Sequence, residues 1–213
     1  MTAMTSTLDI TPFRPTPLAG PISYEQFLTW DGENQHVEWV NGEVIPMAPI
    51  SDAHNELTAF LCALLRLFAE QTKLGVVRHD PFQMKTGPNL PGRAPDLMFI
   101  LEKNRPRLKH TYLEGPADLV IEVLSPGNQG VDRGDKYLEY ERGGVPEYWL
   151  LDPERQEHEF YQLGSNGRYR LTAIPADGVY RSPAINGLWI KPAWLSQRPR
   201  PTVISIAKEW GLV

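Results

Sequence analysis

Residues 117–126 read Ala-Asp-Leu-Val-Ile-Glu-Val-Leu-Ser-Pro, and this stretch decides the fold. Apolar side chains occupy both alternating faces of the run, which is typical of a central strand covered by helices on both sides of a sheet. Glu122 interrupts the run. An ionised carboxylate in such surroundings is costly unless a partner charge or a metal ion compensates it. The stretch therefore predicts a buried strand that carries a charge in need of a partner.

A second acidic residue stands in a similar place. Residues 95–101 read Pro-Asp-Leu-Met-Phe-Ile-Leu, so Asp96 begins an apolar strand. If the two strands are neighbours, Asp96 and Glu122 meet at one end of a sheet. Two adjacent carboxylates cannot both stay ionised without a cation between them, so the pair predicts a divalent-metal site with oxygen ligands. The alternative is that Asp96 caps a turn and Glu122 pairs with a buried Arg or Lys.

Length and composition indicate one globular domain. The chain has 213 residues, of which 41% are hydrophobic and 22% are charged, which is ordinary for a soluble domain. Its one cysteine, Cys62, allows no disulfide framework, and residues 1–10 lack the pattern of a secretory signal. We expect a soluble cytoplasmic protein with no membrane contact. The net charge of −5 argues against a large nonspecific nucleic-acid footprint.

The chain divides into three expected parts. Residues 1–21 are rich in Pro and Thr and predict an extended arm, whereas residues 196–213 predict a C-terminal tail. Residues 22–195 contain strands and helices that do not alternate strictly, which favours a single α/β domain with a mixed sheet.

The first half of this domain has three readable elements. Asn41-Gly42 between two β-rich runs predicts a hairpin over residues 36–45, with Glu38 facing either the interior that holds the acids or water. A helix over residues 53–73 places His54 in its first turn, as an acid/base group at the site or as a structural histidine. Residues 76–85 predict one strand with an edge or bulge at Pro81.

The second half predicts a helix, a strand and a hairpin. In the helix over residues 132–142, the spacing of four places Lys136 on one face with both Asp132 and Tyr140. Residues 145–153 predict another buried strand, and residues 156–174 predict a solvent-facing hairpin.

Taken in order, these segments resemble a known family. They are Pro95-Asp96, Glu122 in its apolar strand, Lys136 with Tyr140 in the next helix, and the run Gly144 to Asp152. This order is similar to that of the Uma-two family of "putative restriction endonucleases", within the PD-(D/E)XK nuclease superfamily, over about residues 22–190. The resemblance implies a restriction-endonuclease-like fold, in which helices flank a mixed central sheet with an added N-terminal β-hairpin and a C-terminal β-hairpin.

The resemblance also implies roles for the site residues. Asp96 and Glu122 would be the ligands of Mg²⁺, with Mn²⁺ as a substitute. Family members carry a catalytic lysine two positions after the second acid, and in this chain that position is Leu124. The resemblance therefore implies that Lys136, from the next helix, takes the role of this lysine. Family members place a hairpin glutamate at the site as well, which makes Glu38 a catalytic candidate.

Four further residues are expected to support this site. They are His54, Ser125, Asp132 and Tyr140, for which turn and helix-surface roles are the alternatives.

The function that the resemblance implies is divalent-metal-dependent hydrolysis of DNA phosphodiester bonds by an endonuclease, leaving 5′-phosphate and 3′-hydroxyl ends. DNA is the expected substrate and a homodimer the candidate assembly. The acidic net charge and Leu124 favour an alternative, a catalytically inactive module that binds nucleic acid or another partner. A third hypothesis, hydrolysis without metal by two carboxylates as in glycosidases, requires an open sugar cleft lined by aromatic residues.

Overall fold

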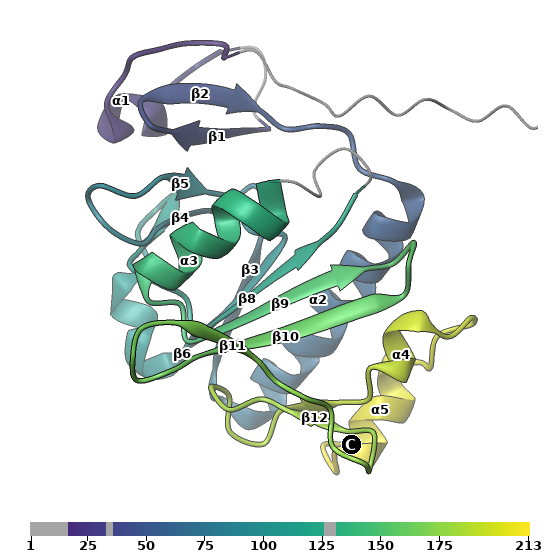
Figure 1. Cartoon of the computed structure of the whole chain (residues 1–213). Coiled ribbons are helices and arrows are strands. Elements are labelled where there is room, and N and C mark those ends of the chain that lie inside the picture. Colours follow the sequence, from purple (N-terminus) through teal and green to yellow (C-terminus); the bar gives the residue numbers. More distant parts are fainter. Residues whose placement is uncertain (1–16, 33–35, 126–130) are drawn as a thin grey trace, which may run out of the picture.

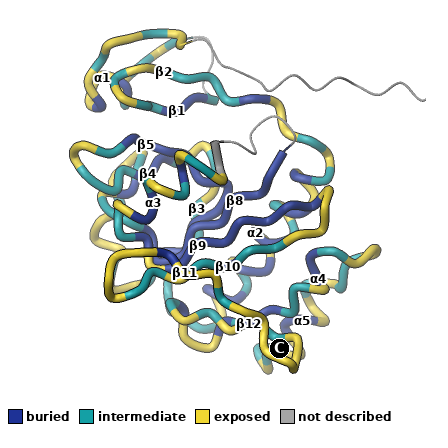
Figure 2. Tube along the Cα trace, in the orientation of Figure 1, coloured by how far each residue is buried: buried dark blue, intermediate teal, exposed yellow. Residues whose placement is uncertain are grey.

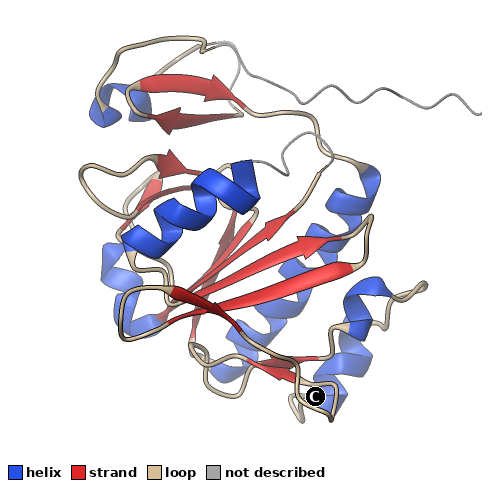
Figure 3. Cartoon of the chain, viewed as in Figure 1, coloured by secondary structure: helices blue, strands red, loops and turns tan. Residues whose placement is uncertain are grey.

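The computed structural model describes residues 17–32, 36–125 and 131–213, except for the side chains of residues 131 and 132. It has a mixed α/β architecture in which helices cover both faces of a six-stranded sheet (Figures 1 and 3). The strand order of this sheet is β11-β10-β9-β8-β6-β3. The strands span Gly75–His79 (β3), Leu97–Leu101 (β6), Leu119–Val123 (β8), Glu147–Asp152 (β9), Glu157–Leu163 (β10) and Tyr169–Leu171 (β11).

Smaller sheets and seven helical segments complete the described fold. The five-stranded sheet β2-β1-β5-β4-β7 contains Val37–Val40 (β1), Glu43–Pro46 (β2), Gln83–Lys85 (β4), Gly92–Arg93 (β5) and Tyr112–Glu114 (β7). The third sheet pairs Tyr180–Arg181 (β12) with Trp189–Ile190 (β13). The helices span Tyr24–Leu28 (α1), Asp52–Thr72 (α2), Glu102–Arg107 (η1), Val131–Lys136 (η2), Tyr137–Gly143 (α3), Ala193–Ser196 (α4) and Val203–Glu209 (α5). Of the described helices, none combines the length and hydropathy that crossing a bilayer requires.

The predicted central strand is β8, which pairs antiparallel with β6 and parallel with β9. Its residues are all buried, and Figure 2 shows β8 and β9 as the deeply buried centre of the sheet. Ile121 and Val123 belong to the core between the sheet and α2, whereas Val120 and Leu124 belong to the core beneath α3. The prediction of a strand covered on both faces is therefore confirmed.

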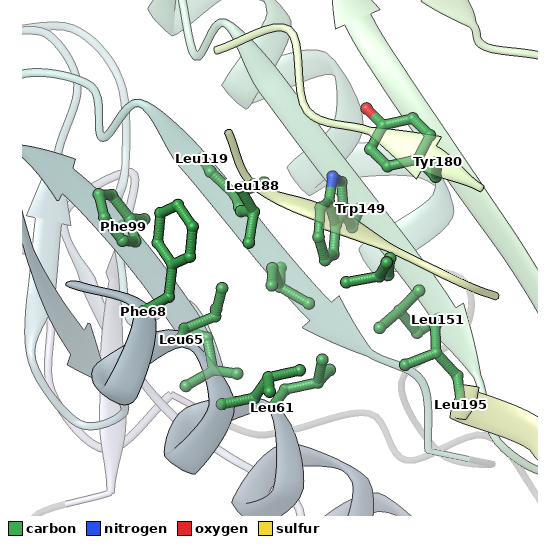
Figure 4. Close-up of a cluster of buried hydrophobic side chains, with 14 of the residues drawn as sticks. Leu61, Leu65, Phe68, Phe99, Leu119, Trp149, Leu151, Tyr180, Leu188 and Leu195 are labelled. Atoms are coloured by element: carbon green, nitrogen blue, oxygen red, sulfur yellow. The ribbon is translucent and has the colours of Figure 1, made fainter. Parts of the chain in front are cut away.

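The core on the α2 side is built from leucines of α2 and from aromatic side chains of the sheet and the C-terminal segment (Figure 4). Trp149 is fully buried and packs edge-on against the stacked rings of Phe160 and Tyr180, whose centroids lie 5.2 and 5.6 Å from its own. Each fully buried large apolar side chain contributes about 1.5–3 kcal/mol. This packing holds β8 and β9 in the register that the candidate site requires.

Two local predictions near the amino terminus are confirmed. Asn41 and Gly42 have φ values of 52° and 92°, as a two-residue hairpin turn requires, and they join β1 to β2. The backbone N–H of His54 donates to the hydroxyl of Ser51, which caps α2 and places His54 in the first turn.

One strand prediction needs correction, whereas both hairpin predictions hold. The single strand expected over residues 76–85 is wrong, because β3 and β4 belong to different sheets and the chain turns between them at Pro81, which has no N–H for a ladder. The expected N-terminal hairpin forms from β1 and β2, and β1 also pairs with β5. The expected second hairpin forms from β10 and β11, and β10 joins it to the central sheet.

Candidate active site

The register of β6 against β8 brings the two acids together. Leu97 lies opposite Ile121, so one further step along the antiparallel pair places Asp96 opposite Glu122. Both side chains are buried, with Asp96 9% and Glu122 1% exposed. Because like charges directly opposite each other destabilise a sheet, each carboxylate needs its own donors or a cation.

Asp96 has one oxygen held by the protein and one left open. Its Oδ2 accepts a hydrogen bond of 2.7 Å from the backbone N–H of Val123 and lies 3.1 Å from Nε2 of His54. Its Oδ1 accepts no hydrogen bond from the residues that the structure describes. The arrangement fixes the carboxylate while leaving a ligand atom available.

Glu122 contacts two groups from the following helical segment. The hydroxyl of Tyr140 donates to Oε1 at 2.6 Å, and Nζ of Lys136 lies 3.1 Å from Oε2. The spacing of four along the helix brings both groups to the same strand, as expected for one helix face. Burial and the adjacent carboxylate raise the pKa of Tyr140 well above its ordinary value, so the phenol remains a proton donor near neutral pH.

Lys136 is only 4% exposed and lies between two carboxylates. Besides Glu122, it approaches Oε1 of Glu38 at 3.6 Å. Leu124 is buried in the core beneath α3, on the same side of β8 as Glu122, and provides no charge. The ammonium group beside Glu122 therefore comes from the next helical segment. The chain itself compensates the charge of Glu122, as the alternative to a metal site predicted.

Arg93 holds Glu38 in place by an ion pair, and the sequence analysis did not identify this arginine. Arg93 Nη1 donates to Glu38 Oε2 at 2.7 Å, and the backbone N–H of Ala94 donates to Oε1 at 3.1 Å. The same guanidinium donates to both oxygens of Glu139 in α3, at 2.7 and 2.8 Å. Burial acts to raise the pKa of Glu38, but the positive charges of Lys136 and Arg93 outweigh it and hold that pKa below its ordinary value.

A pocket of about 270 Å³ opens on this cluster. Asp96, Glu122, Lys136 and His54 line it together, whereas Glu38 reaches it through Lys136. The wall also contains a pair that the sequence did not indicate, His36 and Asp80, with Nε2 and Oδ2 2.5 Å apart. The hydrogen bond to Asp80 raises the pKa of His36 against the opposing effect of burial.

The four residues expected to support the site differ in position. His54 contacts Asp96 and Tyr140 contacts Glu122, as described above. The hydroxyl of Ser125 is buried and has no hydrogen-bond partner among the described residues. The side chain of Asp132 lies outside the described part of the chain, so its expected contact with Lys136 stays a prediction.

The donor set fits one hard divalent cation. Among the described residues, no group of three or more His, Cys, Asp or Glu side chains is arranged to hold a metal ion. Mg²⁺ needs no such cage, since it is typically held by one or two carboxylates and completed by water and substrate phosphate. The open Oδ1 of Asp96 and the carboxylate of Glu122 on the same pocket meet that requirement.

Three comparisons show which known proteins this chain is similar to. A protein of Synechocystis sp. named "Uncharacterized protein sll1609" is 27% identical over 152 residues, which cover 67% of this chain and 80% of that protein. The crystal structure of a "putative nuclease belonging to DUF820" from Anabaena variabilis ATCC 29413 superposes with a TM-score of 0.66 at 18% identity, over 82% of this chain and 97% of the other. That structure shares the fold. The family model Uma2, described as "Putative restriction endonuclease", matches residues 24–193, and the chain belongs to this family.

Proposed function

We propose that this protein is a divalent-metal-dependent endonuclease that hydrolyses phosphodiester bonds of DNA. The observation that carries the proposal is the meeting of Asp96, Glu122 and Lys136 in one pocket. Asp96 immediately precedes β6, Glu122 lies in β8 and Lys136 ends η2, and all three are buried. Buried charges gathered around a pocket favour a functional site over a purely structural one.

Asp96 and Glu122 would hold the ion, Mg²⁺ in the native protein and Mn²⁺ as its substitute. A divalent ion in such a site supplies Lewis-acid polarisation of a phosphoryl oxygen and lowers the pKa of bound water. The ammonium of Lys136 donates hydrogen bonds to the attacking water or to the phosphate oxygens, where negative charge develops during in-line displacement. Bond cleavage on the side of the 3′-oxygen leaves 5′-phosphate and 3′-hydroxyl ends.

The surrounding residues keep these groups in place. His54 orients Asp96, and Tyr140 holds Glu122 through its hydroxyl. Glu38 fixes the second side of Lys136, while Arg93 links Glu38 to α3. Because partners of this kind restrict the rotamers of the reacting groups, their loss lowers the rate without removing the chemistry.

Cleavage of supercoiled plasmid DNA tests the proposal. The wild type should nick or cut the plasmid with Mg²⁺ or Mn²⁺ and be inactive with EDTA. Asp96→Ala and Glu122→Ala should lose this activity while circular dichroism shows that the fold is kept. Cutting that persists undiminished in both folded variants contradicts the assignment of these residues.

One observation favours a second candidate, a module that binds nucleic acid or another partner without turnover. The ion pair between Glu122 and Lys136 balances the buried charge without any metal, and Leu124 occupies the family's lysine position. Such a module predicts no cleavage with any divalent ion, together with binding that does not depend on Asp96.

A further inference from the structure

A second, larger hollow lies beside the edge strand of the central sheet. It has a volume of about 1100 Å³ and runs along β3, between α1, α2 and η1. We call it the β3 groove. Pockets that hold one drug-sized molecule measure about 300–1,000 Å³, so the β3 groove is large enough for an extended ligand.

The β3 groove carries more positive than negative side chains. Its lining contains Arg66, Lys73, Arg78 and Arg105 against Glu70 and Glu102, an excess of two cations in a chain of net charge −5. Arg105 is paired with Glu102 at 3.2 Å. Arg66 on α2 and Lys73, the residue that follows this helix, are exposed and form no ion pair with the described residues. These two cations are therefore free to neutralise phosphate groups.

Aromatic rings lie along the same groove. Trp30 and Phe82 are partly exposed in its lining, and the guanidinium carbon of Arg78 lies 5.7 Å from the centroid of the Phe82 ring. Free cations and accessible rings in one groove are a combination that binds single-stranded nucleic acid, in which phosphates contact the cations and unpaired bases stack on the rings. A duplex keeps its base faces stacked inside and offers such rings no surface.

The β3 groove adjoins the candidate active site. His79 lines both hollows. On β1, Val37 lines the groove, while the next residue, Glu38, contacts Lys136 of the site. In the turn after β3, Asp80 lines the site pocket and Phe82 the groove. A strand lying in the groove and extended past His79 would thus reach the pocket that Asp96 and Glu122 line.

The edge of β3 is less suited to pairing with a second copy of the chain. The carbonyl oxygen of Val77 already accepts a hydrogen bond of 2.9 Å from Nη1 of Arg78. A blocked acceptor and a charged side chain on an edge strand both oppose the addition of another strand.

We propose that the β3 groove binds a single-stranded segment of nucleic acid beside the candidate active site. Phosphates contact Arg66 and Lys73, and bases stack on Trp30 and Phe82. The inference rests on the proposed function for its orientation toward the site, but the binding itself can be measured without cleavage.

Fluorescence anisotropy in EDTA tests it, with labelled oligonucleotides of about 12 units, a length typical of such sites. Poly-dT, poly-rU and a DNA duplex of the same length serve as probes, so that the arms separate DNA from RNA and single from double strands. The test variant combines Arg66→Gln with Lys73→Gln. Its control combines Arg170→Gln with Lys208→Gln, which makes the same charge change at two exposed cations outside the groove lining. Arg170 lies on β11, at the opposite edge of the sheet. Trp30→Leu removes the ring, and Trp30→Phe keeps one.

We expect the wild type to bind a single strand more tightly than the duplex. The groove double variant should lose about tenfold in affinity and reduce the slope of log affinity against log salt by about 1.4, which is ~0.7 for each lost phosphate contact. Trp30→Leu should lose at least about fivefold, whereas Trp30→Phe and the control pair stay near the wild type. Thermal melts establish that each variant is folded.

Unchanged affinity in the groove variants overturns the inference, as does equal loss for single strand and duplex. It is also overturned if these variants dissociate a dimer in sedimentation analysis while oligonucleotide affinity stays the same. The variant Glu122→Gln separates the two proposals, since it should bind as the wild type does but not cut. If the wild type cleaves plasmid but the groove variants bind oligonucleotides normally, only the groove proposal is contradicted. If binding depends on the groove but no divalent ion supports cleavage, only the nuclease proposal is contradicted.

Discussion

Two buried glutamates lie on neighbouring strands but have different partners in the fold. Glu122 on β8 is 1% exposed and Glu147 on β9 is 0% exposed. Glu122 contacts Lys136 and faces the site pocket. Glu147 lies in neither described pocket and accepts hydrogen bonds from neutral donors: the Trp149 indole, the hydroxyls of Tyr180 and Ser182, and the Ala184 backbone N–H.

The comparison shows how a carboxylate at the candidate site differs from a buried carboxylate with a structural role. Glu147 ties the segment around β12 to the central sheet, and Figure 4 shows Trp149 and Tyr180 side by side in that core. Burial raises the pKa of Glu147 even though four donors oppose the shift. Glu122 also has a neutral donor, Tyr140, but it differs from Glu147 in having an ionic partner, Lys136, which also approaches Glu38. A buried carboxylate alone therefore indicates little, whereas a buried carboxylate with cations and an open pocket indicates function.

The largest expected difference is in activity. Glu122→Gln should lower the rate of plasmid cleavage by ~10³-fold, because it removes charge where a cation and the developing phosphate charge must be balanced. Glu147→Gln should keep a rate within a few fold of the wild type at a temperature where both are folded. The comparison fails if both variants lose activity equally.

The next effect is on stability. Glu38→Ala removes one carboxylate from two buried cations, although Arg93 keeps Glu139 and Lys136 keeps Glu122. We expect a loss of about 3 kcal/mol in the free energy of unfolding in urea, at the low end for a broken buried pair. The control Glu102→Ala breaks an exposed pair with Arg105 and should cost less than about 1 kcal/mol. Equal losses would show that burial of the ion pairs around Glu38 does not increase their contribution to stability.

A smaller effect is expected from His54, which contacts Asp96 at 3.1 Å. His54→Ala should weaken Mn²⁺ affinity or activity by about 10–100-fold, as is usual for a partner of a metal ligand. His158→Gln is a matched control, because this histidine bonds Ser196 outside the site pocket. Unchanged affinity after removal of His54 would make it a structural histidine.

The smallest effect is the pH dependence, which should have opposite signs for two glutamates. The folded-state pKa of Glu38 is lowered, so its contribution to stability is present above the ordinary value of 4.5 and is lost as the pH falls below it. The pKa of Glu147 is raised, so its contribution is present below 4.5 and is lost as the pH rises through the folded-state value. Urea unfolding at about pH 4 and about pH 7 compares the wild type with Glu38→Gln and Glu147→Gln. From acid to neutral pH, the stability difference from the wild type should grow for Glu38→Gln and shrink for Glu147→Gln.

The sequence predicted the strands that carry the acids, since a charge inside an apolar run is a local signal. It also predicted the helix that has His54 in its first turn and the Asn41-Gly42 turn, which depend on local sequence patterns. The placement of Lys136 opposite Glu122 was inferred from the family resemblance, and the structure brings the two side chains within 3.1 Å.

Other features depend on contacts between distant segments, and the sequence did not reveal them. Arg93 lies in a two-residue strand and finds its partners, Glu38 and Glu139, tens of positions away on either side. His36 and Asp80, which are 44 positions apart, are likewise brought together only by the tertiary fold. The strand predicted over residues 76–85 divides between two sheets because of tertiary pairing, which local propensity does not encode.

The central claim is that Asp96 and Glu122 hold a divalent cation and that Glu147 does not. Titration calorimetry with Mn²⁺ on the wild type, Asp96→Asn, Glu122→Gln and Glu147→Gln tests it most directly. We predict heat from a saturable site in the wild type and in Glu147→Gln, with that site lost in both variants of the pocket acids. No saturable uptake by the wild type, or the same uptake by all four proteins, would contradict the account.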